Sequence, residues 1–177
     1  MTYRARGSTL RAFSRSLEKK RYIPYIIETS AGLTRNLLMI LCDAYDEEQV
    51  ADKGNCASDG SADDWRTVLR FHPDLAPVTV AVLPLMKKDG LAEIAQDIRA
   101  ELKEDYATDY DQAGAIGRRY RRQDEAGTPF CVTVDYQSKE DGTVTLRFRD
   151  SMEQVRVPKA ELAARLRQEI KAYKRIK

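Results

Sequence analysis

The sequence has few of the residues that build metal centres and disulfide frameworks. Among 177 residues there are three cysteines and one histidine. The cysteines, at positions 42, 56 and 131, form no Cys-x-x-Cys pair. An odd number of widely spaced cysteines argues against a disulfide framework and against a cysteine–histidine zinc site. This usage is typical of a reduced protein, so we expect a cytoplasmic location and no metal ligands in the chain.

Long hydrophobic runs and a strong net charge are also missing. No run approaches the roughly 18 apolar residues of a membrane span, and the basic N-terminus lacks the apolar stretch of a secretory signal. We therefore expect no membrane partner. The formal net charge is only +2, although 33% of the residues are charged. A nucleic-acid binder with this balance would have to concentrate positive charge locally.

The first 74 residues divide into three parts by composition. Residues 1–21 are basic and show no period, which predicts a disordered arm. In residues 22–45 a strand, a tight turn at Gly32 and a helix follow one another. Residues 46–74 open with an acidic, small-residue stretch that cannot bury much apolar surface, which predicts a linker or insertion. The two regular elements expected here are a strand at 22–27 and a helix at 33–45.

Residues 75–177 alternate strand and helix patterns. Strands are expected at 78–85, 106–110, 130–136, 143–149 and 155–157, and helices at 91–102, 116–125 and 159–173. Glu140-Asp141-Gly142 is typical of a hairpin turn. Helices between the early strands imply parallel pairing and the late hairpin implies antiparallel pairing. We therefore predict an α/β fold with a mixed five-stranded sheet flanked by helices.

A first motif lies at residues 22–45, reading YIPYIIETSAGLTR and then LCDAY. Gly32 allows close backbone approach to a nucleotide, and the planar guanidinium of Arg35, one turn into the helix, can stack on a purine ring. A plain strand–turn–helix with a surface arginine fits the same residue types. The segment resembles the third signature motif of class II aminoacyl-tRNA synthetases in its glycyl form.

This resemblance implies a set of substrate contacts. The carboxylate of Glu28 can pair with the substrate ammonium, and small side chains exclude any amino acid larger than glycine. The glycine pocket would be lined by Glu28, Thr29, Ser30, Ala31 and Gly32. The ATP contacts would come from Gly32, Leu33, Thr34 and Arg35.

A second, longer set of motifs follows the linker. It reads LAP, VLPLMKKDGL, GAIGRRYRRQDE, GTPFCVTVD, DGTVT and MEQVRVP between residues 75 and 158. These segments are similar to the anticodon-binding domain of the bacterial-type glycyl-tRNA synthetase family. The resemblance implies the class II anticodon-binding domain fold at 75–177, preceded at 22–45 by a strand–turn–helix remnant of the class II catalytic domain.

Positive charge is concentrated in two of these segments. Lys87 and Lys88 follow the first strand of the domain, at the end where open α/β sheets place ligands. The other tRNA-binding candidates are Arg118, Arg119, Tyr120, Arg121 and Arg122, which offer phosphate partners and one stacking ring. Successive helix positions point to different faces, so some arginines should pair with Asp124 or Glu125 and only one or two should touch RNA.

The chain departs from the family in lacking the two earlier class II motifs. Without their positioned charges, the third motif alone should not activate glycine. We therefore assign no catalytic residue and expect no cofactor for this chain alone. Residues 1–20 do not match the family pattern, which predicts a truncated or frame-disrupted gene product. Without a catalytic sheet, the helix at 33–45 should expose an apolar face.

Three functions remain open. The first is a fragment of a glycine–tRNA ligase, for which the resemblance implies a glycine tRNA partner, ATP with magnesium and a homodimer in the full-length enzyme. The second is a freestanding, non-catalytic anticodon-binding module. The third is an accessory subunit like the processivity subunit of mitochondrial DNA polymerase, which no positive feature supports; no DNA partner is expected. Retention of residues 28–35 favours the first, and loss of the earlier motifs favours the second.

Overall fold

The computed structural model describes residues 12–13, 21–22, 29–49 and 65–174. The chain divides into two compact units, residues 1–36 and 37–177. The first unit contains a short antiparallel ladder between β1 (Ala12–Phe13) and β2 (Arg21–Tyr22). The rest of the basic arm, and all but Tyr22 of the strand expected at 22–27, lie outside the described residues.

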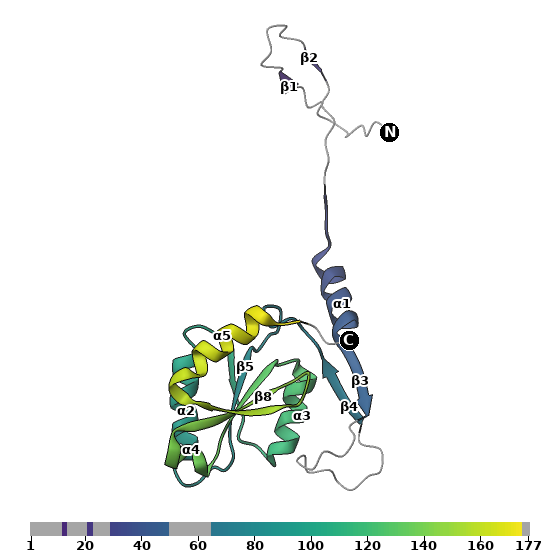
Figure 1. The fold of residues 1–177 in the computed structure, drawn as a ribbon. Coiled ribbons are helices and arrows are strands. Elements are labelled where there is room, and N and C mark those ends of the chain that lie inside the picture. The colour runs from purple at the N-terminus through teal and green to yellow at the C-terminus, as the bar shows by residue number, and fades with distance from the viewer. Residues whose placement is uncertain (1–11, 14–20, 23–28, 50–64, 175–177) are drawn as a thin grey trace. The chain divides into compact units, whose positions relative to one another are not determined.

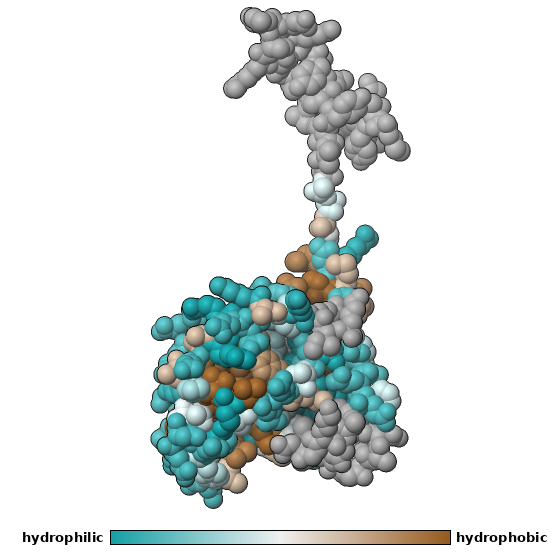
Figure 2. All heavy atoms as spheres, in the orientation of Figure 1, coloured by the Kyte–Doolittle hydropathy of each residue, from teal (hydrophilic) through white to brown (hydrophobic). Residues whose placement is uncertain are grey.

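The helix expected after Gly32 is confirmed as α1 (Leu33–Ala44). Asn36 donates its backbone N–H to the carbonyl of Gly32 at 3.0 Å, which closes the first turn. Leu37, Leu38 and Met39 are each more than half exposed, and Figure 2 shows hydrophobic colouring on this helix. Several apolar side chains of this helix are therefore exposed.

Two strands occupy part of the segment expected to be a linker. β3 (Tyr45–Gln49) pairs antiparallel with β4 (Trp65–Leu69), from Tyr45 opposite Leu69 to Gln49 opposite Trp65. These strands were not expected from the composition, because ion pairs rather than apolar burial hold β3. Residues 50–64 lie outside the described part of the chain, and the domain limits themselves stay a prediction.

The expected mixed five-stranded sheet is confirmed, in the order β6-β5-β7-β8-β9. β5 pairs in parallel with β6 and β7, whereas β8 pairs antiparallel with β7 and β9 (Figure 1). Since β5 and β7 are buried along their whole length, they occupy the centre of the fold. The strands are β5 (Val80–Pro84), β6 (Thr108–Tyr110), β7 (Phe130–Val134), β8 (Thr143–Phe148) and β9 (Gln154–Pro158).

Helices cover both faces of this sheet (Figure 1). The buried apolar side chains of α2 (Leu91–Leu102) and α5 (Leu162–Ala172) share the main core with alternate residues of β5, β7 and β8. A short 3-10 turn, Lys159–Glu161, precedes α5. On the other face α3 (Ile116–Ala126) packs Tyr120 against Ala81, Leu83 and Cys131. The result is a three-layer α/β arrangement.

The connection between β7 and β8 is a helix rather than the expected hairpin turn. α4 (Tyr136–Asp141) begins with a capping box: Asp135 accepts from the Ser138 N–H at 3.0 Å, and Ser138 Oγ accepts from the Asp135 N–H at 3.1 Å. Gly142, in the left-handed region at φ 66°, ends it. Antiparallel pairing of β7 with β8 is confirmed, but Asp141-Gly142 ends a helix instead of turning a hairpin.

The end of α3 depends on a glycine. Gly127 caps the helix at φ 79°, as its position before Pro129 predicts. A Cβ built at Gly127 would lie 2.4 Å from Cδ2 of Phe71 and 2.9 Å from the carbonyl oxygen of Leu69. The glycine therefore allows both a left-handed backbone and close contact with the chain that follows β4.

A buried ionic network joins the β3–β4 hairpin to α3 and β8. Asp124, fully buried, accepts two hydrogen bonds from Arg147 at 2.8 and 3.0 Å and lies 3.0 Å from Nε of Arg66. Glu48 binds Arg66 at 2.7 Å. The partners of Asp124 thus come from β4 and β8 and not from α3, and the expectation that some α3 arginines pair with Asp124 or Glu125 stays a prediction. The network pairs four arginines, Arg66, Arg70, Arg147 and Arg149, with four carboxylates, Asp46, Glu48, Asp124 and Asp150.

Candidate nucleic-acid interface

The three parallel strands end at one side of the sheet. Their register sets Val82 of β5 opposite Tyr110, the last residue of β6, and Pro84 of β5 opposite Val134, the last residue of β7. Open α/β sheets bind ligands beyond these carboxyl ends. We use the name loop edge for the residues that follow them, 85–90, 111–118 and 135–139.

The first loop of the edge carries two exposed lysines. Lys87 and Lys88 lie between β5 and α2, and both are exposed. The chain then turns through two residues with positive φ, Asp89 at 65° and Gly90 at 76°. Lys139 Nζ donates to the carbonyl of Asp89 at 2.6 Å. The turn is thus fixed from α4, and the lysines are presented on an anchored loop.

An aromatic ring stands beside this loop. Tyr136, at the start of α4, is 45% exposed, and its hydroxyl donates to Asp89 at 3.1 Å and lies 2.9 Å from the sulfur of Met86. The hydrogen bond to Asp89, with some burial, raises the pKa of Tyr136 above its ordinary value. A ring that is anchored through its hydroxyl but still half exposed suits stacking of an unpaired base.

The second loop is fixed by Arg122. Its guanidinium donates to Asp111 at 3.0 and 2.5 Å and to the carbonyl of Ala113 at 2.6 Å. Burial alone raises the pKa of Asp111, but the N–H of Ala113 and the guanidinium of Arg122 hold this pKa below its ordinary value. The guanidinium of Arg122 therefore serves to hold the conformation of this loop. Arg118, in the first turn of α3, is exposed on the same edge.

Two of the tRNA-binding candidates on α3 lie inside the protein. Only 2% of Arg119 and 4% of Tyr120 is exposed. Tyr120 shares a hydrogen bond of 2.6 Å with Thr133, and its ring lies 4.7 Å from the guanidinium carbon of Arg147. The expectation of a stacking ring at Tyr120 is corrected, since a buried ring cannot receive a base. Arg119 is likewise unavailable to phosphates, and Arg121 is half-buried.

The residues expected to bind glycine and ATP belong to the first compact unit. Glu28 falls outside the described residues. The other candidates are all exposed, so they enclose no binding site among themselves: Thr29, Ser30, Ala31, Gly32, Leu33, Thr34 and Arg35. Their expected contacts to glycine and ATP are untested by the structure and stay predictions.

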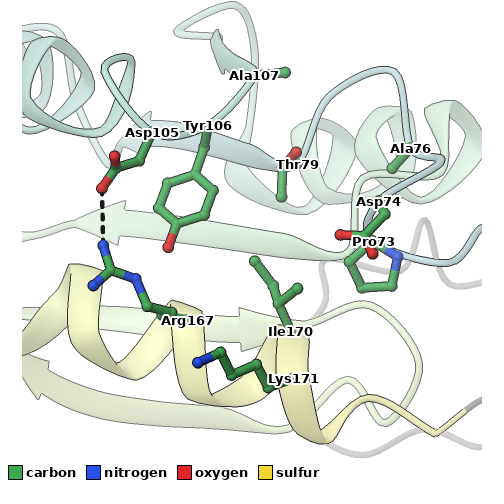
Figure 3. A pocket seen from close by; sticks show the side chains of 10 residues that line it. All are labelled: Pro73, Asp74, Ala76, Thr79, Asp105, Tyr106, Ala107, Arg167, Ile170 and Lys171. Carbon is green, nitrogen blue, oxygen red and sulfur yellow. Dashed lines mark hydrogen bonds and ion pairs between the residues drawn. The ribbon is translucent and has the colours of Figure 1, made fainter.

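The opposite end of the sheet holds an open pocket of about 460 Å³ (Figure 3). Tyr106 and Ile170 line it, and Arg167 reaches across to Asp105 at 3.2 Å. Two of its four charged side chains, Arg167 and Asp105, pair with each other. Within the described residues, no group of three or more histidine, cysteine or carboxylate side chains is placed to hold a metal ion, and no helix is long and apolar enough to cross a membrane.

Comparison with known families identifies the class of domain. A mixed five-stranded sheet with helices on both faces is the fold of class II anticodon-binding domains. The family model described as an anticodon binding domain matches residues 79–169, just over half of the chain. The chain belongs to this anticodon-binding domain family. Prolyl-tRNA synthetase from Cryptosporidium parvum shares this fold, with a TM-score of 0.55 at 22% identity over 59% of this chain and 23% of that one.

Two curated proteins are similar to this chain over most of its length. Glycine–tRNA ligase from Treponema denticola is 71% identical over 96% of this chain, and that from Treponema pallidum is 60% identical over 88%. The chain spans 36% of the length of each. Coverage of 96% must include part of residues 1–21. Part of this arm is therefore aligned with that relative, contrary to the expectation that residues 1–20 as a whole fall outside the family pattern.

Tyr136 and Lys139 are site residues that sequence reasoning missed. The sequence predicted a strand that runs through Tyr136 into a hairpin turn, so the rule for strand ends did not select this residue. The strand in fact ends at Val134, and Tyr136 begins a helix.

Proposed function

We propose that this chain binds the anticodon stem-loop of a glycine tRNA through the loop edge, as the C-terminal part of a glycine–tRNA ligase. One observation carries the proposal: the loops beyond the parallel strand ends carry exposed Lys87, Lys88 and Arg118 and the half-exposed ring of Tyr136 at one edge. The names of the curated relatives support glycine as the amino acid.

The chemistry of this edge suits a single-stranded RNA loop. Unpaired bases stack on aromatic rings, and their phosphates are met by cations. Tyr136 offers the ring, while Lys87 and Lys88 offer mobile point charges and Arg118 a planar, five-donor cation. Anchoring of the Tyr136 hydroxyl means that less side-chain freedom is lost when a base stacks on it.

We also propose a role for the motif at residues 28–35. In a full-length enzyme these residues would line the glycine pocket and contact ATP held with magnesium, in a cytoplasmic homodimer. A freestanding, non-catalytic tRNA-binding module is the alternative. It is favoured by the exposure of every described residue of this motif, Thr29 to Arg35. Under both, we expect no glycine-dependent exchange of pyrophosphate into ATP from this chain alone.

The direct test is binding of the purified chain to a glycine tRNA transcript, beside the same transcript with its last two anticodon bases changed. We expect preference for the unchanged transcript and weaker binding as salt rises. Tyr136→Ala should weaken binding roughly 5- to 150-fold, the range for loss of one stacked base, and Tyr136→Phe should retain most of the affinity. Lys87→Ala should reduce the slope of log affinity against log salt by about one.

Lys171→Ala provides the matched control, since Lys171 is exposed on α5 beside the pocket at the other end of the sheet. Its removal should leave both affinity and salt slope unchanged. Equal binding of the two transcripts would refute anticodon reading. Equal losses in Lys87→Ala and Lys171→Ala would refute the loop edge as the site, because general charge attraction would then explain both.

A further inference from the structure

Arg119 is a buried arginine at the centre of the loop edge. Its guanidinium donates to three backbone carbonyls: Pro84 at 2.5 Å, Leu85 at 3.1 Å and Asp111 at 3.2 Å. Pro84 ends β5, and Asp111 directly follows β6. One side chain from α3 thus bridges the ends of two neighbouring parallel strands.

These carbonyls need a donor because the sheet ladder ends there. The N–H of Leu85 still bonds to Val134 and that of Asp111 approaches the carbonyl of Val82, but beyond them the strands separate into loops. A buried carbonyl without a partner costs about as much as a lost hydrogen bond. The fork of a guanidinium reaches two strands at once, which an ammonium cannot do with the same geometry. Burial lowers the pKa of Arg119, although Asp111 opposes this.

We propose that Arg119 is a positioning residue for RNA binding, one that fixes the two basic segments of the loop edge relative to each other without touching RNA. The proposal rests on the function proposed above. Lys87 lies two residues beyond Leu85, and the loop that starts at Asp111 leads into the helix turn of Arg118. A shift of either loop therefore moves a cation relative to the others.

Arg119 and Arg122 both hold loops of this edge, Arg119 from inside the protein and Arg122 from its surface. Arg122 closes the second loop on itself through Asp111 and Ala113. Only Arg119 of the two reaches the first loop. Loss of Arg122 should loosen one loop, whereas loss of Arg119 should loosen both.

A positioning role and a phosphate contact predict opposite results for a lysine replacement. Lysine keeps the charge, so R119K would bind tRNA almost as wild type does if Arg119 contacted a phosphate. For a positioning residue, R119K loses the bridge, and tRNA affinity should fall about tenfold with an unchanged salt slope. R119Q should behave in the same way, because no phosphate contact is removed.

The experiment combines tRNA affinity at several salt concentrations with amide hydrogen exchange of the RNA-free chain. We expect R119K to accelerate exchange about tenfold or more at residues 85–90 and 111–115, with β8 unchanged. Arg118→Gln is the matched control: it should reduce the salt slope by about one and leave exchange in both loops as in wild type. Near-wild-type affinity of R119K, or a reduced slope in R119Q, would overturn the proposal.

Two further measurements distinguish failure of the proposed function from failure of the positioning role. If the wild-type chain does not bind tRNA, the proposed function fails, while loop exchange in R119K still tests the bridge. If R119K does not fold, the guanidinium resonances of the wild-type chain decide. Those of Arg119 should exchange slowly with solvent and stay unperturbed when tRNA is added, whereas those of Arg118 should shift. Perturbation of Arg119 together with rapid exchange would exclude the positioning role.

Discussion

The substitution Asp124→Asn tests the ionic network at its most buried carboxylate. Asp124 is fully buried and faces two arginines, Arg147 through two hydrogen bonds and Arg66 through one contact. Asparagine keeps the shape but removes the charge and turns one acceptor into a donor, which then points at a guanidinium. The change therefore leaves buried positive charge without its counterion.

The expected cost follows from this geometry. Breaking a buried, hydrogen-bonded charge pair by removing one partner costs about 3–5 kcal/mol. Glu48 remains bound to Arg66 at 2.7 Å, so the loss should fall near the lower end, about 3 kcal/mol. A domain of this size has a total free energy of unfolding of about 5–15 kcal/mol. The variant should thus fold but with a melting temperature lowered by roughly 10 °C.

Urea unfolding followed by circular dichroism measures this loss. Glu125→Gln is the matched control, because the neighbouring Glu125 is exposed and its change should stay within about 0.5 kcal/mol. Adding Arg147→Met to Asp124→Asn should cost less than Arg147→Met alone, since the arginine has already lost its partner. A loss below about 1 kcal/mol in Asp124→Asn, or full additivity in the cycle, would refute the reasoning.

Three further outcomes are expected. Gly127→Ala should lower the free energy of unfolding by well over the ~1–2 kcal/mol that a left-handed backbone costs an alanine, because the added Cβ would lie 2.4 Å from Phe71. Gly142→Ala, at φ 66° with open space around it, is the control in urea unfolding. Burial raises the pKa of Asp150, but Arg149 and Tyr173 hold this pKa below its ordinary value of 3.8. Its stabilisation is therefore present above pH 3.8 and lost as the pH falls through the lowered value, so Asp150→Asn should flatten the acid limb of a stability–pH curve. Burial raises the pKa of Cys131 to about 12, so a thiol reagent at about pH 8 should label exposed Cys42 and spare Cys131 in peptide mapping; equal labelling would contradict the buried environment.

The helices were predictable because their apolar positions and end signals are local. The period of α2 and the glycine after α3 lie in the sequence itself, and both elements occur where they were expected. β3 was not predictable in this way, because its residues YDEEQ carry almost no apolar signal. Its partners Arg66 and Arg70 lie 18 or more residues away, so only tertiary structure reveals why it forms.

The site was predictable in part for the same reason. Lys87 and Lys88 were found from the rule that ligands bind beyond parallel strand ends. Arg119 and Tyr120 were misassigned because α3 turns a polar face inward: the sequence RRYRR gives no sign of which positions are buried. That choice depends on carbonyls and carboxylates supplied by other strands, which periodicity alone does not report.

The ionic network extends beyond the stretch of chain that the family model matches. A fragment limited to residues 79–169 or 75–177 would carry Asp124 and Asp150 but lack Arg66 and Arg70. It would also lose Phe71, which packs on Gly127. Cloning boundaries drawn at the limits of the family match would thus separate buried charges from their counterions. A soluble anticodon-binding fragment should instead start before Tyr45, so that each of these arginines and carboxylates keeps its partner.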